Sequence, residues 1–258
     1  MALPWSEDSP PIRGKGGPFS RRTAAKLRRI AVAFSMHIGG RPSGLGDTMA
    51  MANMKAHKTQ IRIIAGSLRG RRVTCTVSEE LRPTPDRVRG AFFSILGDAI
   101  PDRPFFDIFA GSGVVGIEAI SRGAASTVFL ERDFSLAQSI DQHLREFGVA
   151  GKGQVLRADV YRWAERWLPA AGTPANLFLS PPFADLQNRL GDFLKLVATL
   201  QEKAPVDSVL TVQVEDDFPS EQLPDAERWE RRQYGRNLLF VWMKPAAEFP
   251  SLESSIGQ

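Results

Sequence analysis

Short apolar runs alternate along the middle of the chain with longer segments in which apolar residues recur at helical spacing. The apolar runs cover residues 105–109, 127–130, 154–156, 175–179 and 208–214. Runs of this length, separated by helical segments, are typical of parallel strands in a sheet that helices cover on both faces. The pattern therefore predicts an α/β fold with a mostly parallel sheet.

The two ends of this region have a different pattern. Before it, residues 61–64 and 71–77 flank a turn-prone stretch and predict a β-hairpin. After it, residues 231–234 and 238–243 are joined by a tight link at 235–237, which predicts an antiparallel hairpin at the edge of the sheet. An amphipathic helix is expected after the first hairpin, because apolar residues follow at helical spacing: Val88, Phe92, Ile95 and Leu96.

These patterns divide the chain into four parts. Residues 1–57 are rich in Gly, Pro, Ser and Arg, and we expect a disordered basic extension there. Residues 58–100 are the predicted hairpin and helix, residues 101–246 the α/β domain, and residues 247–258 a flexible tail. Three methionines near the end of the extension are candidate translation starts: Met49, Met51 and Met54.

Composition narrows the class of protein. The single cysteine and the three histidines lie far apart in the sequence, which gives neither a disulfide framework nor the spacing of metal ligands. No apolar run approaches the roughly 20 residues of a membrane-spanning helix. We therefore expect a soluble, cytoplasmic protein that is monomeric and binds no metal.

Charge becomes informative only when it is divided along the chain. The first 57 residues hold nine Lys or Arg against three Asp or Glu, whereas residues 58–258 hold 24 against 26 and are nearly neutral. Eight basic residues and three acidic ones lie between residues 58 and 90. This segment is the best candidate for a surface that faces nucleic-acid phosphates. An ordinary solvated surface is the alternative interpretation.

A glycine-rich turn links the first strand of the α/β region to a helix. It contains Gly111-Ser112-Gly113 and then Gly116, and such glycines let a ligand approach the backbone closely. Glu131 follows 20 residues after Gly111, where its carboxylate can accept hydrogen bonds from ribose hydroxyls. The turn is therefore predicted to bind a nucleotide cofactor.

The same glycines fit the dinucleotide pattern of dehydrogenases. Asp107, just before the turn, disfavours that reading because an acid repels a pyrophosphate but suits a sulfonium ligand with an ammonium group. No site for hydride transfer is recognisable in the sequence. A turn that serves packing alone is the other alternative. Asp159, after the third strand, is expected to bind an adenine amino group or to cap a helix, and both readings stay open.

Ser180-Pro181-Pro182-Phe183 follows the fourth strand of the predicted sheet. Open α/β sheets bind ligands at this carboxyl edge. The two prolines stiffen the backbone and hold carbonyl oxygens in place. Ser180 and the Pro181 carbonyl can accept hydrogen bonds from an amino group on an aromatic base, and Phe183 offers a face for stacking. A buried structural turn is the alternative.

In combination, these motifs resemble bacterial methyltransferases that modify guanine N2 in small-subunit (16S) ribosomal RNA. The resemblance runs from about Arg62 to Lys244 and includes the segment 81–89, Leu-Arg-Pro-Thr-Pro-Asp-Arg-Val-Arg. It implies a class I, Rossmann-like methyltransferase fold with a seven-stranded sheet. It also implies S-adenosylmethionine (SAM) as cofactor and ribosomal RNA, or the assembling small subunit, as partner. Residues 58–100 would bind RNA and cover the cofactor.

The site residues expected from the motifs and the resemblance fall into three groups. The reaction site is Ser180, Pro181, Pro182 and Phe183. The cofactor ligands are Thr84, Asp107, Phe109, Ala110, Gly111, Ser112, Gly113, Glu131, Arg132, Asp159 and Val160. The RNA contacts are Arg69, Arg71, Arg82, Arg87 and Arg89.

Ser180 departs from the family, which usually has Asp there. A hydrogen bond to a charged acceptor is worth roughly 1.5–3 kcal/mol against about 1 kcal/mol for a neutral one. A serine therefore predicts slower chemistry, a different target amine, or an inactive relative that still binds RNA. DNA adenine-N6 methylation is the alternative activity. We favour an active enzyme because the other motifs are complete.

Overall fold

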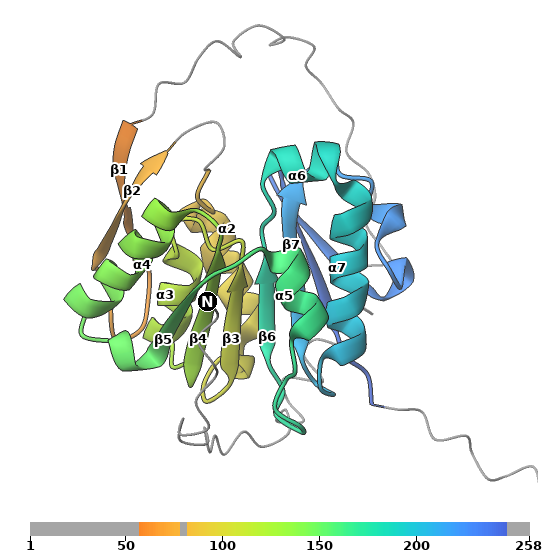
Figure 1. Ribbon diagram of the computed structural model, residues 1–258, viewed down its shortest axis with the longest axis horizontal. Helices are drawn as coiled ribbons and strands as arrows, with labels where there is room; N and C mark the ends of the chain where they lie inside the picture. Colours follow the sequence, from red (N-terminus) through yellow and green to blue (C-terminus); the bar gives the residue numbers. More distant parts are fainter. Residues whose placement is uncertain (1–56, 78–81, 247–258) are drawn as a thin grey trace, which may run out of the picture.

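A seven-stranded sheet forms the centre of the computed structural model, which describes residues 57–77 and 82–246. The strand order is β5-β4-β3-β6-β7-β9-β8 (Figure 1). The strands β3 to β7 are parallel, whereas β9 is antiparallel to both β7 and β8. Their bounds are β3 Pro104–Ile108, β4 Ser126–Glu131, β5 Gly153–Arg157, β6 Asn176–Leu179, β7 Val209–Glu215, β8 Glu230–Tyr234 and β9 Asn237–Met243. The predicted α/β fold with an antiparallel edge hairpin is confirmed.

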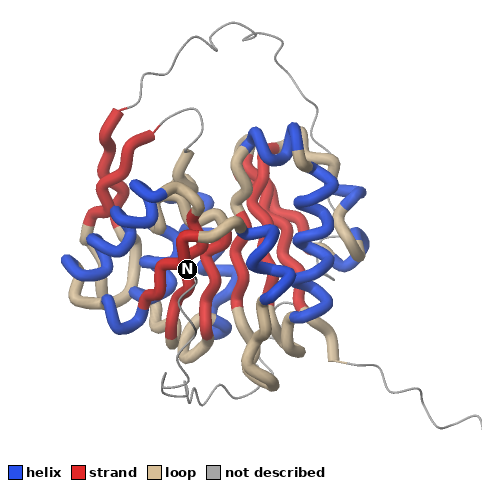
Figure 2. The backbone as a smooth tube through the Cα atoms, viewed as in Figure 1, coloured by secondary structure: helices blue, strands red, loops and turns tan. Residues whose placement is uncertain are grey.

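Helices cover both faces of the sheet (Figure 2). Side chains of α2, α3 and α4 join one hydrophobic cluster, and those of α5, α6 and α7 join the other. The helices are α2 Asp86–Leu96, α3 Val114–Ser121, α4 Phe134–Glu146, α5 Val160–Arg166, α6 Phe183–Asn188 and α7 Leu190–Lys203, with short 3-10 turns η1 Gly97–Ala99, η2 Ala150–Lys152, η3 Ser220–Gln222 and η4 Ala226–Arg228. Among the described residues, no helix is long and apolar enough to cross a membrane.

Alternation along the strands divides the core between these two layers. In β3, Phe105 packs into the α2–α4 layer while Ile108 packs into the α5–α7 layer. The strands are apolar on both faces, as expected for parallel strands that are buried between helices. The chain runs from β3 outward through β4 to β5, then returns to β6 on the other side of β3. This reversal between β3 and β6 is where open α/β sheets bind ligands, at the carboxyl ends of the strands.

The predicted N-terminal hairpin is present as β1 His57–Arg62 and β2 Arg72–Val77. Its turn packs on the end of α3, where Ser67 N–H donates to the Ser121 carbonyl at 2.8 Å. Gly66 has φ +84°, and a Cβ there would lie 1.9 Å from the Ser121 carbonyl oxygen, so this approach requires glycine. The hairpin thus forms part of the α3 and α4 layer.

One difference from the sequence prediction concerns the end of the first hairpin strand. Ile64 was expected in the first hairpin strand, but that strand ends at Arg62 and the Ile64 N–H donates to a Glu118 carboxylate oxygen at 3.3 Å. Ile64 therefore connects the hairpin to α3 and does not pair with the second hairpin strand. The expected extension, apart from His57, and the expected tail at 247–258 lie outside the described residues.

Candidate active site

The glycine turn after β3 has an unusual backbone. Phe109, Gly111 and Gly113 all have positive φ, at 65°, 53° and 72°. The Gly113 N–H donates to the Ala110 carbonyl at 2.7 Å and closes the turn, and α3 begins at the next residue. Positive φ is uncommon for a bulky residue such as Phe109 and marks backbone strain. The chain therefore folds back sharply at the carboxyl edge, as predicted for a cofactor turn.

Asp107 lies beneath this turn and is almost completely buried. Its Oδ2 atom accepts a hydrogen bond from the Gly116 N–H at 2.8 Å. Burial raises the pKa of Asp107 to about 7; the Gly116 bond lowers it and the nearby charge of Glu131 raises it. A cationic ligand bound beside Asp107 would favour its ionised form, because an opposite charge stabilises a carboxylate.

Glu131 ends β4, beside β3, and holds the turn in place. One carboxylate oxygen accepts the Gly111 N–H at 2.8 Å and the other accepts the Asp133 N–H at 2.8 Å. A carboxylate has about four lone-pair sites. Each oxygen of Glu131 therefore has capacity left for a hydroxyl donor. Its position fits the predicted contact to a ribose, which remains a prediction.

Asp159 is the N-cap of α5. Its Oδ1 atom accepts the N–H groups of Tyr161 and Arg162 at 3.0 and 3.1 Å. The capping role left open by the sequence is thus present, and a contact to adenine remains a prediction. The neighbouring Val160 is buried in the α5–α7 cluster. Ser112 is also buried, and its hydroxyl accepts the Val114 N–H at 3.4 Å.

The Ser180–Phe183 turn begins beside the cofactor turn. Ser180 N–H donates to the carbonyl of Ile108, the last residue of β3, at 3.4 Å. Pro182 is extended at φ −57° and ψ 146°, and its carbonyl accepts the Asp185 N–H at 3.0 Å to start α6. Phe183 is 49% exposed. The predicted reaction site and cofactor turn therefore lie on adjacent strands at one edge.

The segment 82–85 lies against β7, the next strand. Thr84 is buried, and its hydroxyl donates to Gln213 Oε1 at 2.7 Å. The Nη1 atom of Arg82 lies 3.5 Å from the Oε1 atom of Glu215. Since Leu179 pairs with Val212, Gln213 is level with Ser180 on the neighbouring strand. Gln213 was not recognised from the sequence, although a polar residue inside an apolar strand run was a visible signal.

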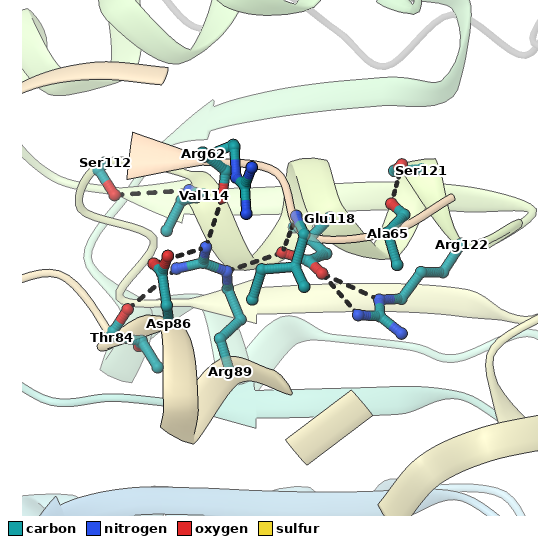
Figure 3. Close-up of polar contacts among 12 residues, drawn as sticks. Arg62, Ala65, Thr84, Asp86, Arg89, Ser112, Val114, Glu118, Ser121 and Arg122 are labelled. Carbon is teal, nitrogen blue, oxygen red and sulfur yellow. Dashed lines mark hydrogen bonds and ion pairs between the residues drawn. The ribbon is translucent and has the colours of Figure 1, made fainter. Parts of the chain in front are cut away.

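Arg89 corrects one prediction. Its side chain has no exposed area, so it cannot contact RNA as expected. The guanidinium donates to Glu118 Oε2 at 2.7 Å and to the Arg62 carbonyl at 2.7 Å (Figure 3). It also bonds to the Thr84 carbonyl and to Asp86. Arg89 therefore joins the hairpin, the segment 82–85 and α3.

The other arginines predicted to bind RNA are exposed but spread out. Arg82 and Arg87 flank the start of α2. Arg71 lies over the ring of Phe147, at the C-terminal end of α4, with its guanidinium 5.6 Å from the ring centre. Arg69 is in the hairpin turn, which contacts Ser121 at the end of α3. Arg69 and Arg71 are thus at the opposite end of α3 and α4 from the cofactor turn.

The pairing of Asp185 with Tyr161 was not predicted from the sequence. Asp185 in α6 is buried, and its Oδ2 atom accepts a hydrogen bond from the Tyr161 hydroxyl at 2.8 Å. Arg132, predicted as a cofactor ligand, is exposed and lies 3.8 Å from Asp185. Tyr161 and Asp185 are 24 positions apart in the sequence, and no sequence pattern indicates this pairing.

The strand order and the turn after β3 define a Rossmann-like class I methyltransferase fold. The solved structure of the Escherichia coli protein yhhF superposes with a TM-score of 0.59 at 26% identity, and the match covers 73% of this chain and 100% of that one. The chain belongs to the family described as Conserved hypothetical protein 95, which matches residues 61–243.

Two curated relatives carry the same name, "Ribosomal RNA small subunit methyltransferase D". The Escherichia coli protein is 42% identical over 125 residues, covering 48% of this chain and 61% of the relative. The Haemophilus influenzae protein is 37% identical over 132 residues, covering 49% of this chain and 65% of the relative. The chain thus matches somewhat less than two thirds of each relative's length. The family resemblance inferred from the motifs is confirmed.

Proposed function

We propose that this protein transfers a methyl group from SAM to the exocyclic N2 amine of a guanine in small-subunit ribosomal RNA. One observation carries the proposal: the Ser180–Phe183 turn is hydrogen-bonded to the end of β3, directly beside the glycine turn and its two buried carboxylates. The cofactor and the target base would therefore bind side by side, at the ends of the adjacent strands β3 and β6. The names of the curated relatives support methyl transfer to small-subunit ribosomal RNA.

The residues around the glycine turn fit SAM. Buried Asp107 favours a cation, and Glu131 offers acceptor capacity to hydroxyl groups. A dinucleotide would place a pyrophosphate near two carboxylates, which is unfavourable. SAM, when bound, supplies a methyl group on a sulfonium. Further ligands at this edge would be Thr84, Phe109, Ala110, Gly111, Ser112, Gly113, Arg132, Asp159 and Val160.

At the reaction site, the chain would hold the base amine. Its lone pair is delocalised into the ring, so the amine is a poor nucleophile. If the Ser180 hydroxyl and the Pro181 carbonyl accept its N–H bonds, the nitrogen becomes more pyramidal and its lone pair is aimed. Exposed Phe183 would stack on the base, which must leave its helix or loop to reach the site. The rest of the rate enhancement would come from holding the amine close to the methyl group and in line with it.

For the RNA itself, we propose phosphate contacts from Arg69, Arg71, Arg82 and Arg87, all of which are exposed. Because Arg69 and Arg71 lie far from the carboxyl edge, an RNA that reaches all four must extend along α3 and α4. A folded ribosomal RNA, or an assembling small subunit, is large enough for this. Such a substrate would place the protein in the cytoplasm. We propose that it acts as a monomer.

A transfer assay tests this function. The purified chain is incubated with SAM that carries a radiolabelled methyl group, and with unmodified small-subunit particles, free ribosomal RNA or duplex DNA. We expect label in the RNA-containing samples alone. Label in DNA would contradict the proposal. Calorimetric binding of SAM with no transfer to any substrate would instead identify an RNA-binding relative impaired by Ser180.

A further inference from the structure

Asp185 connects the proposed base-binding turn to the rest of the site. It lies two residues after Phe183, in the first turn of α6, and is only 5% exposed. Its Oδ2 atom accepts the Tyr161 hydroxyl at 2.8 Å, and its Oδ1 atom lies 3.8 Å from Arg132. The six-residue helix that presents Phe183 is therefore held by two groups from the other side of β3.

Tyr161 belongs to the proposed adenine side. Its N–H is bound by Asp159, and its ring contacts Phe109 edge-on, with ring centres 6.0 Å apart. The Arg189 guanidinium lies over the same ring, 4.1 Å from its centre. Burial, followed by the bond to Asp185, raises the pKa of Tyr161. Tyr161 therefore lies between the strained cofactor turn and Asp185.

Arg132 reaches Asp185 from a second direction. It directly follows Glu131 at the end of β4, whereas Asp185 lies in the helix after β6. Since β3 lies between β4 and β6, the ion pair spans the carboxyl end of β3, where the cofactor turn begins. The Arg132 side chain is 63% exposed, so this contact is open to rearrangement when a ligand enters.

We propose that Tyr161, Asp185 and Arg132 form a coupling clasp, which transmits occupancy of the cofactor side to the helix that presents Phe183. A ligand bound against residues 109–113 and 159–161 would restrict Tyr161, and Tyr161 would in turn restrict Asp185 and the orientation of Phe183. The three are positioning residues. The inference rests on the proposed function, because it assumes one site for cofactor and base. Site-to-site couplings typically change affinity by about 5- to 150-fold.

The variant Tyr161→Phe tests the clasp, because it removes the hydroxyl and keeps the ring. Tyr234→Phe is the matched control, since the chain has only two tyrosines. The affinity for free small-subunit ribosomal RNA is measured with and without saturating S-adenosylhomocysteine. We expect at least fivefold tighter RNA binding with S-adenosylhomocysteine in the unaltered protein and in Tyr234→Phe. In Tyr161→Phe we expect a change of less than twofold.

Kinetics separate coupling from general damage to the fold. We expect Tyr161→Phe to lower kcat on RNA while the affinity for SAM in the absence of RNA changes less than twofold, because the coupling acts only when both ligands are bound. Asp185→Asn, which keeps an acceptor for Tyr161 but loses the charge that faces Arg132, should have an intermediate coupling ratio. Equal ratios in all four proteins would overturn the clasp while methyl transfer by the unaltered protein still supports the proposed function. If the unaltered protein transfers no methyl group, the proposed function and the clasp both fail.

Discussion

The Oδ2 atom of Asp107 lies 2.8 Å from the amide nitrogen of Gly116, so the carboxylate at the end of β3 accepts a hydrogen bond from the first turn of α3. This bond fixes a buried acid directly beneath the cofactor turn. The acid is thus positioned by the fold before any ligand binds. Its own protonation then decides how well it attracts a cation.

Affinity for SAM should depend on pH through Asp107. The pKa is raised from 3.8 to about 7 in the folded protein. Because a cationic ligand favours the ionised form, we expect affinity to rise as pH increases through about 7. Calorimetry between about pH 5.5 and 8.5, roughly 1.5 units either side of the Asp107 pKa, measures the affinity for SAM. Asp107→Asn should bind about 10- to 100-fold more weakly at high pH and lose the dependence. An unchanged profile would remove Asp107 from the site.

The raised pKa of Asp107 should also affect the stability of the folded protein, which should fall as pH rises. Between pH 4 and 7, about the span of the two pKa values, the folded state keeps a proton that the unfolded chain has lost. The contribution of Asp107 to stability therefore falls as pH rises through this window. Without ligand, Asp107→Asn should flatten the pH dependence of the free energy of unfolding, as measured by urea denaturation. A steeper dependence in the variant would contradict the assignment.

Arg89 should matter for stability and not for direct RNA contact. Removing one partner of a buried ion pair costs about 3–5 kcal/mol. We expect Arg89→Met to lower the free energy of unfolding by an amount near the lower end of that range, because Arg122 still pairs with Glu118 at 2.7 Å. Arg87→Met, an exposed control in the same helix, should stay within about 0.5 kcal/mol. Urea denaturation compares the two, and equal free energies of unfolding would refute the role given to Arg89.

Gly116 should not tolerate a methyl group. A Cβ there would lie 2.3 Å from the Phe129 ring, and overpacking of this kind costs about 1–3 kcal/mol. Gly191→Ala is the matched control, because it is also helical and a Cβ there meets nothing within 4 Å. We expect Gly116→Ala to lower the free energy of unfolding and Gly191→Ala to leave it unchanged or raise it. Comparable destabilisation in both would contradict the packing described.

Ser180 is tested by replacing it with the residue that the family usually has. Ser180→Asp should keep or raise the methylation rate, since a charged acceptor binds an amine more strongly. Ser180→Ala removes a neutral acceptor worth about 1 kcal/mol, which corresponds to a roughly fivefold lower rate. Single-turnover assays on RNA measure both. If all three proteins have the same rate, Ser180 has no part in the reaction.

The sequence predicted the strands well because each parallel strand is a continuous apolar run. The spacing of Gly111 and Glu131 also predicted that both lie at the carboxyl edge of the sheet, and a hydrogen bond joins them there. Their contacts to a cofactor remain predictions. Arg89 was misjudged because charge clustering does not tell which arginine has a buried partner 29 residues away. A signal existed: Arg89 is three residues before Phe92 and seven before Leu96, on the apolar face of the helix.

Other parts of the site could not have been predicted. The positive φ of Phe109 depends on the sharp reversal of the chain, which a bulky residue does not favour. The Tyr161–Asp185 bond joins helices that follow different strands, and its geometry depends on the order of strands in the sheet. Local patterns carry no information on such contacts, so they emerge only from the folded chain.

The identity of the methylated base tests the proposed function most directly. Small-subunit particles that lack base methylation are incubated with the protein and SAM, and their RNA is digested to nucleosides for mass spectrometry. Guanine bound through its exocyclic amine between Ser180 and Phe183 predicts N2-methylguanosine as the new product. Methylated adenosine or cytidine, or no new methylated nucleoside, would contradict it.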